Sequence, residues 1–182
     1  ISISRFSGEG WDGKSPRARI TRKEPVTEDA VSMSDVLFEI GDFYLSEAER
    51  RMVETVCGTF EKTVVVLNTG GMVETACFCD NPRIQGLLMA FQGGMEGACA
   101  EAELLMGVSS PSGKLTDTYA RDLDDYPGCA DFYDSEEYVN YYEDIYVGYR
   151  YFETIPGAAG KVVYPFGFGL SYPGFSLTQE TD

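Results

Sequence analysis

Hydrophobic and polar positions along the chain change their period several times, and each change predicts a different element. Residues 1–4, Ile-Ser-Ile-Ser, alternate and predict a short half-buried strand. Ser46, with Glu49 three residues later, forms a capping box that predicts the start of a helix. Apolar residues then recur at helical spacing on one face: Met52, Val53, Val56, Cys57 and Phe60. We therefore expect a strand at residues 1–4 and a helix after Ser46 that packs through one side.

Two apolar runs that follow end at paired glycines. Residues 63–68, Thr-Val-Val-Val-Leu-Asn, are typical of a strand buried on both faces of a parallel sheet, and they lead to Gly70-Gly71. Residues 86–91 form a second run, which ends at Gly93-Gly94. A helix is expected next, with four apolar or small residues at helical spacing: Cys99, Ala102, Leu105 and Met106. Strand, glycine turn, helix and strand predict an α/β layered sandwich with a mostly parallel sheet, and ligand loops at the carboxyl ends of its strands.

Beyond residue 107 the sequence is rich in turns and then in aromatic residues, which concentrate in residues 138–152 and 162–172. Dense tyrosines have two interpretations, an aromatic platform for sugars or a packing layer with its hydroxyl groups at the rim. We favour packing, because a buried tyrosine with a satisfied hydroxyl is the commoner use of this residue.

Length and charge narrow the class of function. A chain of 182 residues with 43% hydrophobic content is expected to form one domain around one core. The 14 Lys and Arg residues against 30 Asp and Glu residues give a net charge of −16, which repels nucleic-acid backbones and anionic membrane surfaces. The sequence shows no apolar run long enough to span a bilayer and no leader pattern. We therefore expect neither a nucleic-acid partner nor a membrane partner.

The cysteine and histidine counts limit the chemistry further. The five cysteines lie in apolar or small-residue surroundings, which predicts reduced, buried thiols and a cytoplasmic location. The chain has no histidine, which excludes a serine or cysteine nucleophile activated by histidine within it. Cys77-Phe78-Cys79 has no second cysteine pair that could complete a metal site. Residues 107–115 resemble a phosphate-binding loop, but the glycine spacing is wrong and Leu115 follows the lysine. No metal or other cofactor is expected, and acid–base chemistry is left to carboxylates, Tyr, Lys or Cys.

One carboxylate stands at the exit of the first predicted strand. Glu9 lies between two glycines in Ser7-Gly8-Glu9-Gly10-Trp11-Asp12, on a loop free to adopt unusual backbone angles. Trp11 offers a flat apolar ring on which the C–H face of a sugar can rest. Residues 13–30 are polar and predict a long loop that leaves this site. Glu9 and Trp11 are consistent with a carbohydrate site, whereas a solvated turn is the alternative for this short pattern.

Six stretches in the same order along the chain resemble the C-terminal α/β domain of glycoside hydrolase family 3, the β-glucosidase group. They are residues 3–12, 64–71, 92–97, 111–115, 142–151 and 164–172. The resemblance implies that residues 1–182 are a portion of that domain, incomplete at its N-terminal side. The catalytic barrel domain, which in this family supplies the nucleophilic Asp and most sugar-binding side chains, is not present in this chain.

What the resemblance implies for the site is a retaining β-glycosidase in which Glu9 is the general acid/base. Such an enzyme needs two carboxyl groups about 5 Å apart, one to attack the anomeric carbon and one to protonate the leaving oxygen. Trp11 and Asp12 would then line the leaving-group side of the pocket. The partners implied are a β-linked oligosaccharide or glycoside, the barrel domain and the remaining part of the α/β domain.

The sequence also departs from the family pattern, at Ala98, Ser110 and Pro173, where relatives often have Gly, Asn and Thr. We expect these positions to lie in loops and to affect local geometry more than activity. Two hypotheses follow: an acid/base-bearing portion of a β-glucosidase, or a non-catalytic α/β carbohydrate-binding or assembly module that keeps the family fold.

Overall fold

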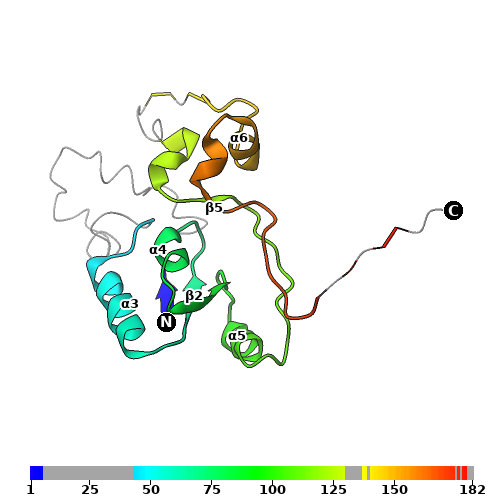
Figure 1. Ribbon diagram of the computed structural model, residues 1–182. Coiled ribbons are helices and arrows are strands. Elements are labelled where there is room, and N and C mark those ends of the chain that lie inside the picture. Colours follow the sequence, from blue (N-terminus) through cyan, green and yellow to red (C-terminus); the bar gives the residue numbers. More distant parts are fainter. Residues whose placement is uncertain (6–42, 130–136, 139, 175, 177, 180–182) are drawn as a thin grey trace.

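The computed structural model confirms the predicted α/β fold. The residues that the structure describes are 1–5, 43–129, 137–138, 140–174, 176 and 178–179. Three strands, β1 (Ser2–Ser4), β2 (Thr63–Asn68) and β3 (Ile84–Met89), form a parallel sheet in the order β1-β2-β3 (Figure 1). Because all three strands are parallel, their carboxyl ends meet at one edge of the sheet.

The register fixes which residues share that edge. Ile3 pairs with Leu67, and Leu67 pairs with Met89. Val65, Val66 and Leu67 are buried, as the β-branched run predicts, whereas Val64 is partly exposed next to Gly86 of the neighbouring strand. Since β2 is the central strand, its last residue, Asn68, lies in the middle of the carboxyl edge.

The helix α3 (Glu47–Thr59) begins with the predicted capping box. The Ser46 hydroxyl accepts a hydrogen bond from the Glu49 backbone N–H at 3.3 Å, and the Glu49 carboxylate accepts one from the Ser46 N–H at 2.9 Å. Its buried residues, Val53 and Cys57, pack against Val65 and Leu67 of β2. The apolar face of α3 that packs on the sheet contains fewer residues than predicted. Phe60, which was expected on this face, follows the last turn and is 58% exposed.

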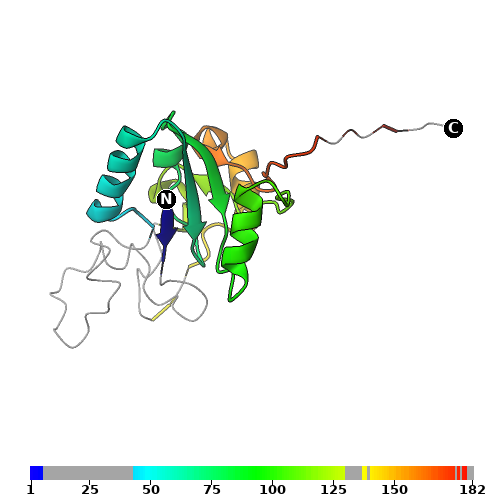
Figure 2. The same cartoon turned by 90° about the horizontal axis from the view of Figure 1, so that it is seen from below.

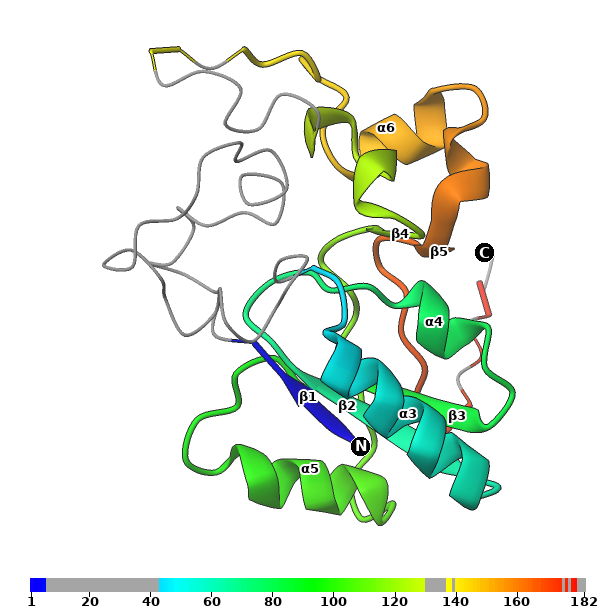
Figure 3. The ribbon, with the colours of Figure 1, turned by 90° about the vertical axis from the view of Figure 1, so that its left-hand side faces the viewer.

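The larger of the two cores in the described residues lies between the sheet and the helices on one side of it. The short helix α4 (Ala76–Cys79) adds Phe78, which is almost fully buried in this core. Figure 3 looks onto the sheet face that α3 and α4 cover. The helix α5 (Gly97–Leu105) lies on the opposite side of the sheet (Figures 1 and 2). It forms as predicted, but none of its residues is buried within the described chain.

A smaller second layer follows the sheet along the sequence. It consists of two antiparallel strands and four short helices: β4 (Tyr119–Ala120), η2 (Leu123–Asp125), η3 (Pro127–Cys129), α6 (Tyr149–Thr154), η4 (Ala158–Lys161) and β5 (Val162–Tyr164). Its core is formed by Ala120, Phe152 and Ala158, with Tyr126 packed against them. The Tyr126 ring meets Phe43 and Phe152 edge-on, at centroid distances of 6.3 and 5.8 Å. Tyr126 therefore joins the second layer to the segment that precedes α3.

We expect Tyr126→Phe to destabilise the second layer by about 1–3 kcal/mol, because two buried backbone groups lose their partner. The Tyr126 hydroxyl accepts from the Ala120 N–H at 2.8 Å and donates to the Thr118 carbonyl at 3.1 Å. Urea unfolding compared with the control Tyr141→Phe, whose ring is 86% exposed, measures the loss. Equal midpoints for the two variants would show that the hydroxyl contributes nothing.

Two of the family-like stretches pair with each other, although they lie more than fifty residues apart. The Leu115 N–H donates to the Phe168 carbonyl at 2.8 Å, and the Gly167 N–H donates to the Leu115 carbonyl at 2.8 Å. A Cβ at Gly169 would lie 2.6 Å from the Gly113 carbonyl oxygen, so a side chain has no room there. The Lys114 ammonium donates to the Gly169 carbonyl, which gives this lysine a structural role in place of phosphate binding.

The prediction of buried thiols is wrong for most of the cysteines. All five are free, but Cys57 alone is buried, and Cys79 and Cys99 are exposed. Cys79 ends the one-turn helix α4, and Cys99 lies on α5, none of whose residues is buried among the described residues.

The prediction that the tyrosines form a packing layer is correct for some residues and wrong for others. Phe152 is buried in the second core, and the half-buried Tyr151 packs against that core. Other aromatic residues of the same stretches are largely exposed: Tyr138, Tyr141, Tyr142 and Tyr172. Periodic aromatic content predicts a packing surface, but burial also needs a neighbouring element, and none of the described residues supplies one there.

Candidate functional site

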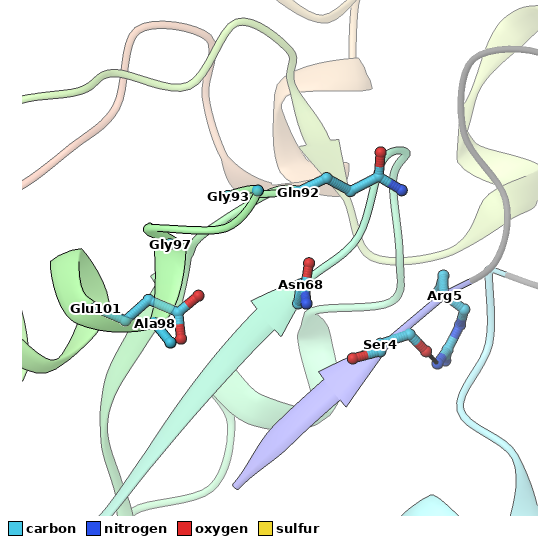
Figure 4. Close-up of a pocket in the computed structure, with 9 residues that line it drawn as sticks. Ser4, Arg5, Asn68, Gln92, Gly93, Gly97, Ala98 and Glu101 are labelled. Atoms are coloured by element: carbon cyan, nitrogen blue, oxygen red, sulfur yellow. Dashed lines mark hydrogen bonds between the residues drawn. The ribbon is translucent and has the colours of Figure 1, made fainter.

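A depression of about 450 Å³ lies at the carboxyl edge of the parallel sheet (Figure 4). The ends of β1 and β2, the loop at residues 92–94 and the first turns of α5 line it. Ligands of open α/β sheets bind outside the carboxyl ends of the strands, which makes this depression the candidate site on geometric grounds.

The end of β1 is held in place by Arg5, whose side chain is fully buried. Its guanidinium donates to both carboxylate oxygens of Glu49, at 2.6 and 3.1 Å, and also to the backbone carbonyls of Ser4 and Tyr44. The Arg5 backbone N–H donates to the Asn68 carbonyl at 3.3 Å. These contacts fix the point at which the chain leaves the sheet towards residue 6, and they engage the guanidinium with Glu49 rather than with a ligand.

The loop after β3 has an unusual backbone. Phe91 has a φ of 56°, which is a genuine outlier for a bulky residue, and Gly94 has a φ of 66°. A Cβ at Gly93 would lie 2.8 Å from the Cα of Gly97. The loop therefore packs directly on the first turn of α5, and glycine at position 93 is required for this close approach.

Three polar side chains reach the depression from separate elements. Asn68 ends β2, Gln92 follows β3, and Glu101 comes from α5 (Figure 4). Asn68 and Glu101 are half-buried, and Gln92 is exposed. Amides supply both donors and acceptors, and a carboxylate supplies acceptors, so together they can bind the hydroxyl groups of a polar ligand.

The sequence-predicted site residues Glu9, Trp11 and Asp12 lie outside the described residues, and so does the predicted loop at residues 13–30. The structure places the strand that precedes Glu9, β1, with its end at the depression. Sequence reasoning missed Asn68, Gln92 and Glu101. A signal for the first two was present, since each comes at the end of a predicted parallel strand and shortly before paired glycines.

The Cys77, Tyr119 and Tyr164 side chains are held in their neutral forms. Burial raises the pKa of the Cys77 thiol to about 12, with a further contribution from the Glu74 carboxylate. Burial likewise raises the pKa of Tyr119 and Tyr164 to about 12. Because a neutral thiol is a poor nucleophile and a neutral phenol is a poor base, these groups do not supply the acid–base chemistry near pH 7.

Two further searches cover the part of the chain that the structure describes. Within it, no group of three or more Cys, Asp or Glu residues is arranged to hold a metal ion. None of the helices in the same ranges is long and apolar enough to cross a membrane.

Residues 7–172 match the model of the glycosyl hydrolase family 3 C-terminal domain. The chain belongs to this family. The resemblance deduced from the sequence motifs is thereby confirmed.

Relatives of the chain are named as glycosidases. It is 52% identical to β-glucosidase A of Butyrivibrio fibrisolvens over 97% of its length, and 37% identical to an exo-α-(1→6)-L-arabinopyranosidase of Bifidobacterium longum over 70%. Among solved structures, a β-glucosidase from Paenibacillus barengoltzii is 38% identical and superposes over 97% of this chain with a TM-score of 0.74. The chain covers 21%, 16% and 17% of these three proteins, respectively.

Proposed function

We propose that this chain is the acid/base-bearing part of a retaining β-glycosidase that hydrolyses terminal β-linked sugars from oligosaccharides or glycosides. The observation that carries the proposal is the convergence of β1 on a polar depression at the carboxyl edge of a family 3 C-terminal domain. The similarity to β-glucosidase A at 52% identity supports the substrate class.

Glu9 is the general acid/base in this proposal. It follows Arg5 by four residues, so the Cα atoms of the two residues are at most about 14 Å apart. Arg5 is fixed by its contacts with Glu49, and the loop that carries Glu9 therefore starts from a rigid point beside the depression. A neutral Glu9 protonates the leaving oxygen in the first step, and the resulting carboxylate activates water in the second.

The rest of the catalytic machinery lies in other parts of the protein. The chain covers about a fifth of its curated relatives, 21% and 20% for the β-glucosidases of Butyrivibrio fibrisolvens and Ruminococcus albus. We place the nucleophilic Asp and most sugar-binding groups in a barrel domain beyond this chain, and Trp11 and Asp12 on the leaving-group side. The five free thiols agree with a cytoplasmic location.

The alternative is a non-catalytic α/β module for carbohydrate binding or assembly. The coding sequence that flanks this chain distinguishes the two, because an adjoining barrel with an Asp at a strand end belongs to the enzyme alone.

The isolated 182-residue chain is expected to hydrolyse no activated aryl β-glucoside at an enzymatic rate, because one carboxyl group cannot perform a double displacement. The assay measures 4-nitrophenol release by the isolated chain and by the full-length protein at equal molar concentration. An inactive chain and an active full-length protein are the expected pair of results. Turnover by the isolated chain comparable to that of the full-length protein would disprove the two-domain assignment.

A further inference from the structure

We propose that the depression at the carboxyl edge of the sheet binds the sugar released as the leaving group, with the side-chain amides of Asn68 and Gln92 as its specificity-determining contacts. This inference rests on the proposed function and extends it, since it assigns a substrate subsite to residues of this chain. The ligand class is a neutral, polyhydroxylated leaving group, such as the second glucose of a β-linked disaccharide.

Position is the first argument. Asn68 ends the central strand, and its backbone carbonyl accepts from the N–H of Arg5, the last described residue before the Glu9 segment. A general acid acts on the oxygen between the two sugars, so groups beside it are nearest to the departing sugar. Since the Cα atom of Glu9 is at most about 14 Å from that of Arg5, the depression lies within reach of the leaving side of the proposed reaction centre, whereas the sugar that forms the covalent intermediate is left to the other domain.

The available hydrogen-bonding groups form the second argument. Neither the Asn68 nor the Gln92 side-chain amide has a hydrogen-bond partner among the described residues, although both line the depression. An amide offers one acceptor oxygen and two N–H donors, which suits a hydroxyl group that both donates and accepts. One amide ends β2 and the other lies on the loop that follows the neighbouring strand β3, and both are free to bind one ligand together.

Charge excludes an anionic ligand. Gly93 and Gly94 before α5, with Gly97 as its first residue, look like a phosphate site, but Glu101 lines the same depression with its carboxylate. The guanidinium of Arg5 is already engaged with both carboxylate oxygens of Glu49. With no uncommitted cation among the residues that line it, the depression favours a neutral polyol over a phosphate or a carboxylate.

The backbone of the loop that carries Gln92 is the third argument. Phe91 is held at a φ of 56°, and the close contact between Gly93 and Gly97 fixes the loop on α5. Strained backbone of this kind persists where the surrounding structure over-determines it and clusters at ligand-binding sites. Gln92 is thus presented at the depression by a rigid loop.

Two substrates that share the first sugar and differ in the leaving group test the subsite. In the full-length protein, Asn68→Ala and Gln92→Ala are each expected to lower kcat/KM for cellobiose by about 3- to 10-fold, the loss of a neutral hydrogen bond. The same variants should change kcat/KM for 4-nitrophenyl β-glucoside by less than about 2-fold, because the nitrophenyl group has no hydroxyls to bind. Gln85→Ala is the matched control, since Gln85 is an exposed amide on β3 outside the depression.

A second readout does not depend on hydrolysis of the disaccharide. A subsite for the leaving sugar also binds an acceptor sugar, so glucosyl transfer from the aryl glucoside to added cellobiose should need a higher acceptor concentration in both variants.

Three outcomes overturn the subsite: equal losses on both substrates, no loss on either substrate, or an unchanged acceptor requirement. These outcomes are separate from failure of the proposed function, which is tested at Glu9 with the aryl glucoside.

Discussion

Glu9→Gln in the full-length protein is expected to lower kcat/KM for an unactivated disaccharide by about 10²–10⁴-fold. Glutamine keeps the size of the side chain but removes both the proton donated to the leaving oxygen and the base that activates water. A 4-nitrophenyl glucoside needs no protonation to leave, so it should still glycosylate the enzyme, which then stalls as the covalent intermediate. Steady-state and pre-steady-state release of nitrophenol measures the two steps separately.

Azide supplies the decisive readout for Glu9. This small anion needs no general base, so it should restore turnover of the aryl glucoside by Glu9→Gln and give a β-glucosyl azide. Glu54→Gln is the control, because Glu54 is an exposed carboxylate on α3. Near-normal activity of Glu9→Gln on the disaccharide, or no azide adduct, would remove Glu9 from this role, and Glu96, Glu143 and Asp144 would be tested next.

The elements predicted from the sequence are those that local patterns determine. The capping box of Ser46 and Glu49 lies within four residues, and α3 starts where it predicts. The strand predicted at residues 63–68 has the same bounds as β2 in the structure, because these residues carry no competing turn or helix signal. Paired glycines likewise marked the carboxyl ends of strands, and the depression lies at that edge.

Features that depend on contacts between distant segments were not predictable in the same way. Glu49 has a second role as the partner of Arg5, which lies 44 residues away in the sequence. The sequences around Tyr126 and Tyr141 do not indicate that the first packs against a core and the second is exposed. Each outcome depends on which distant segment packs nearby. The contact between Gly93 and Gly97 is visible only once the loop is folded onto α5.

Arg5→Met is expected to destabilise the sheet by about 3 kcal/mol, because it leaves the Glu49 carboxylate without its partner in a largely buried place. The side chains of Arg5 and Glu49 are 0% and 16% exposed. Methionine fills the volume of the arginine stem, so the loss reports mainly on charge and hydrogen bonding. Hydrogen exchange of peptides covering residues 1–5 and 63–68 in the full-length protein measures the effect at the strands concerned.

A matched ion pair on the same helix gives the control. Arg51 and Glu47 approach to 3.3 Å but are 70% and 64% exposed, so Arg51→Met should change stability by no more than about 0.5 kcal/mol. The double variant Arg5→Met/Glu49→Gln should recover part of the loss, because glutamine removes the unpaired charge while keeping an oxygen for the Ser46 cap. If Arg5→Met and Arg51→Met gave equal exchange rates at residues 63–68, the Arg5 pair would not be what holds the end of β1. The loop that leads to Glu9 would then start from a mobile point, and the rigid placement of the acid/base at the depression would have to be abandoned.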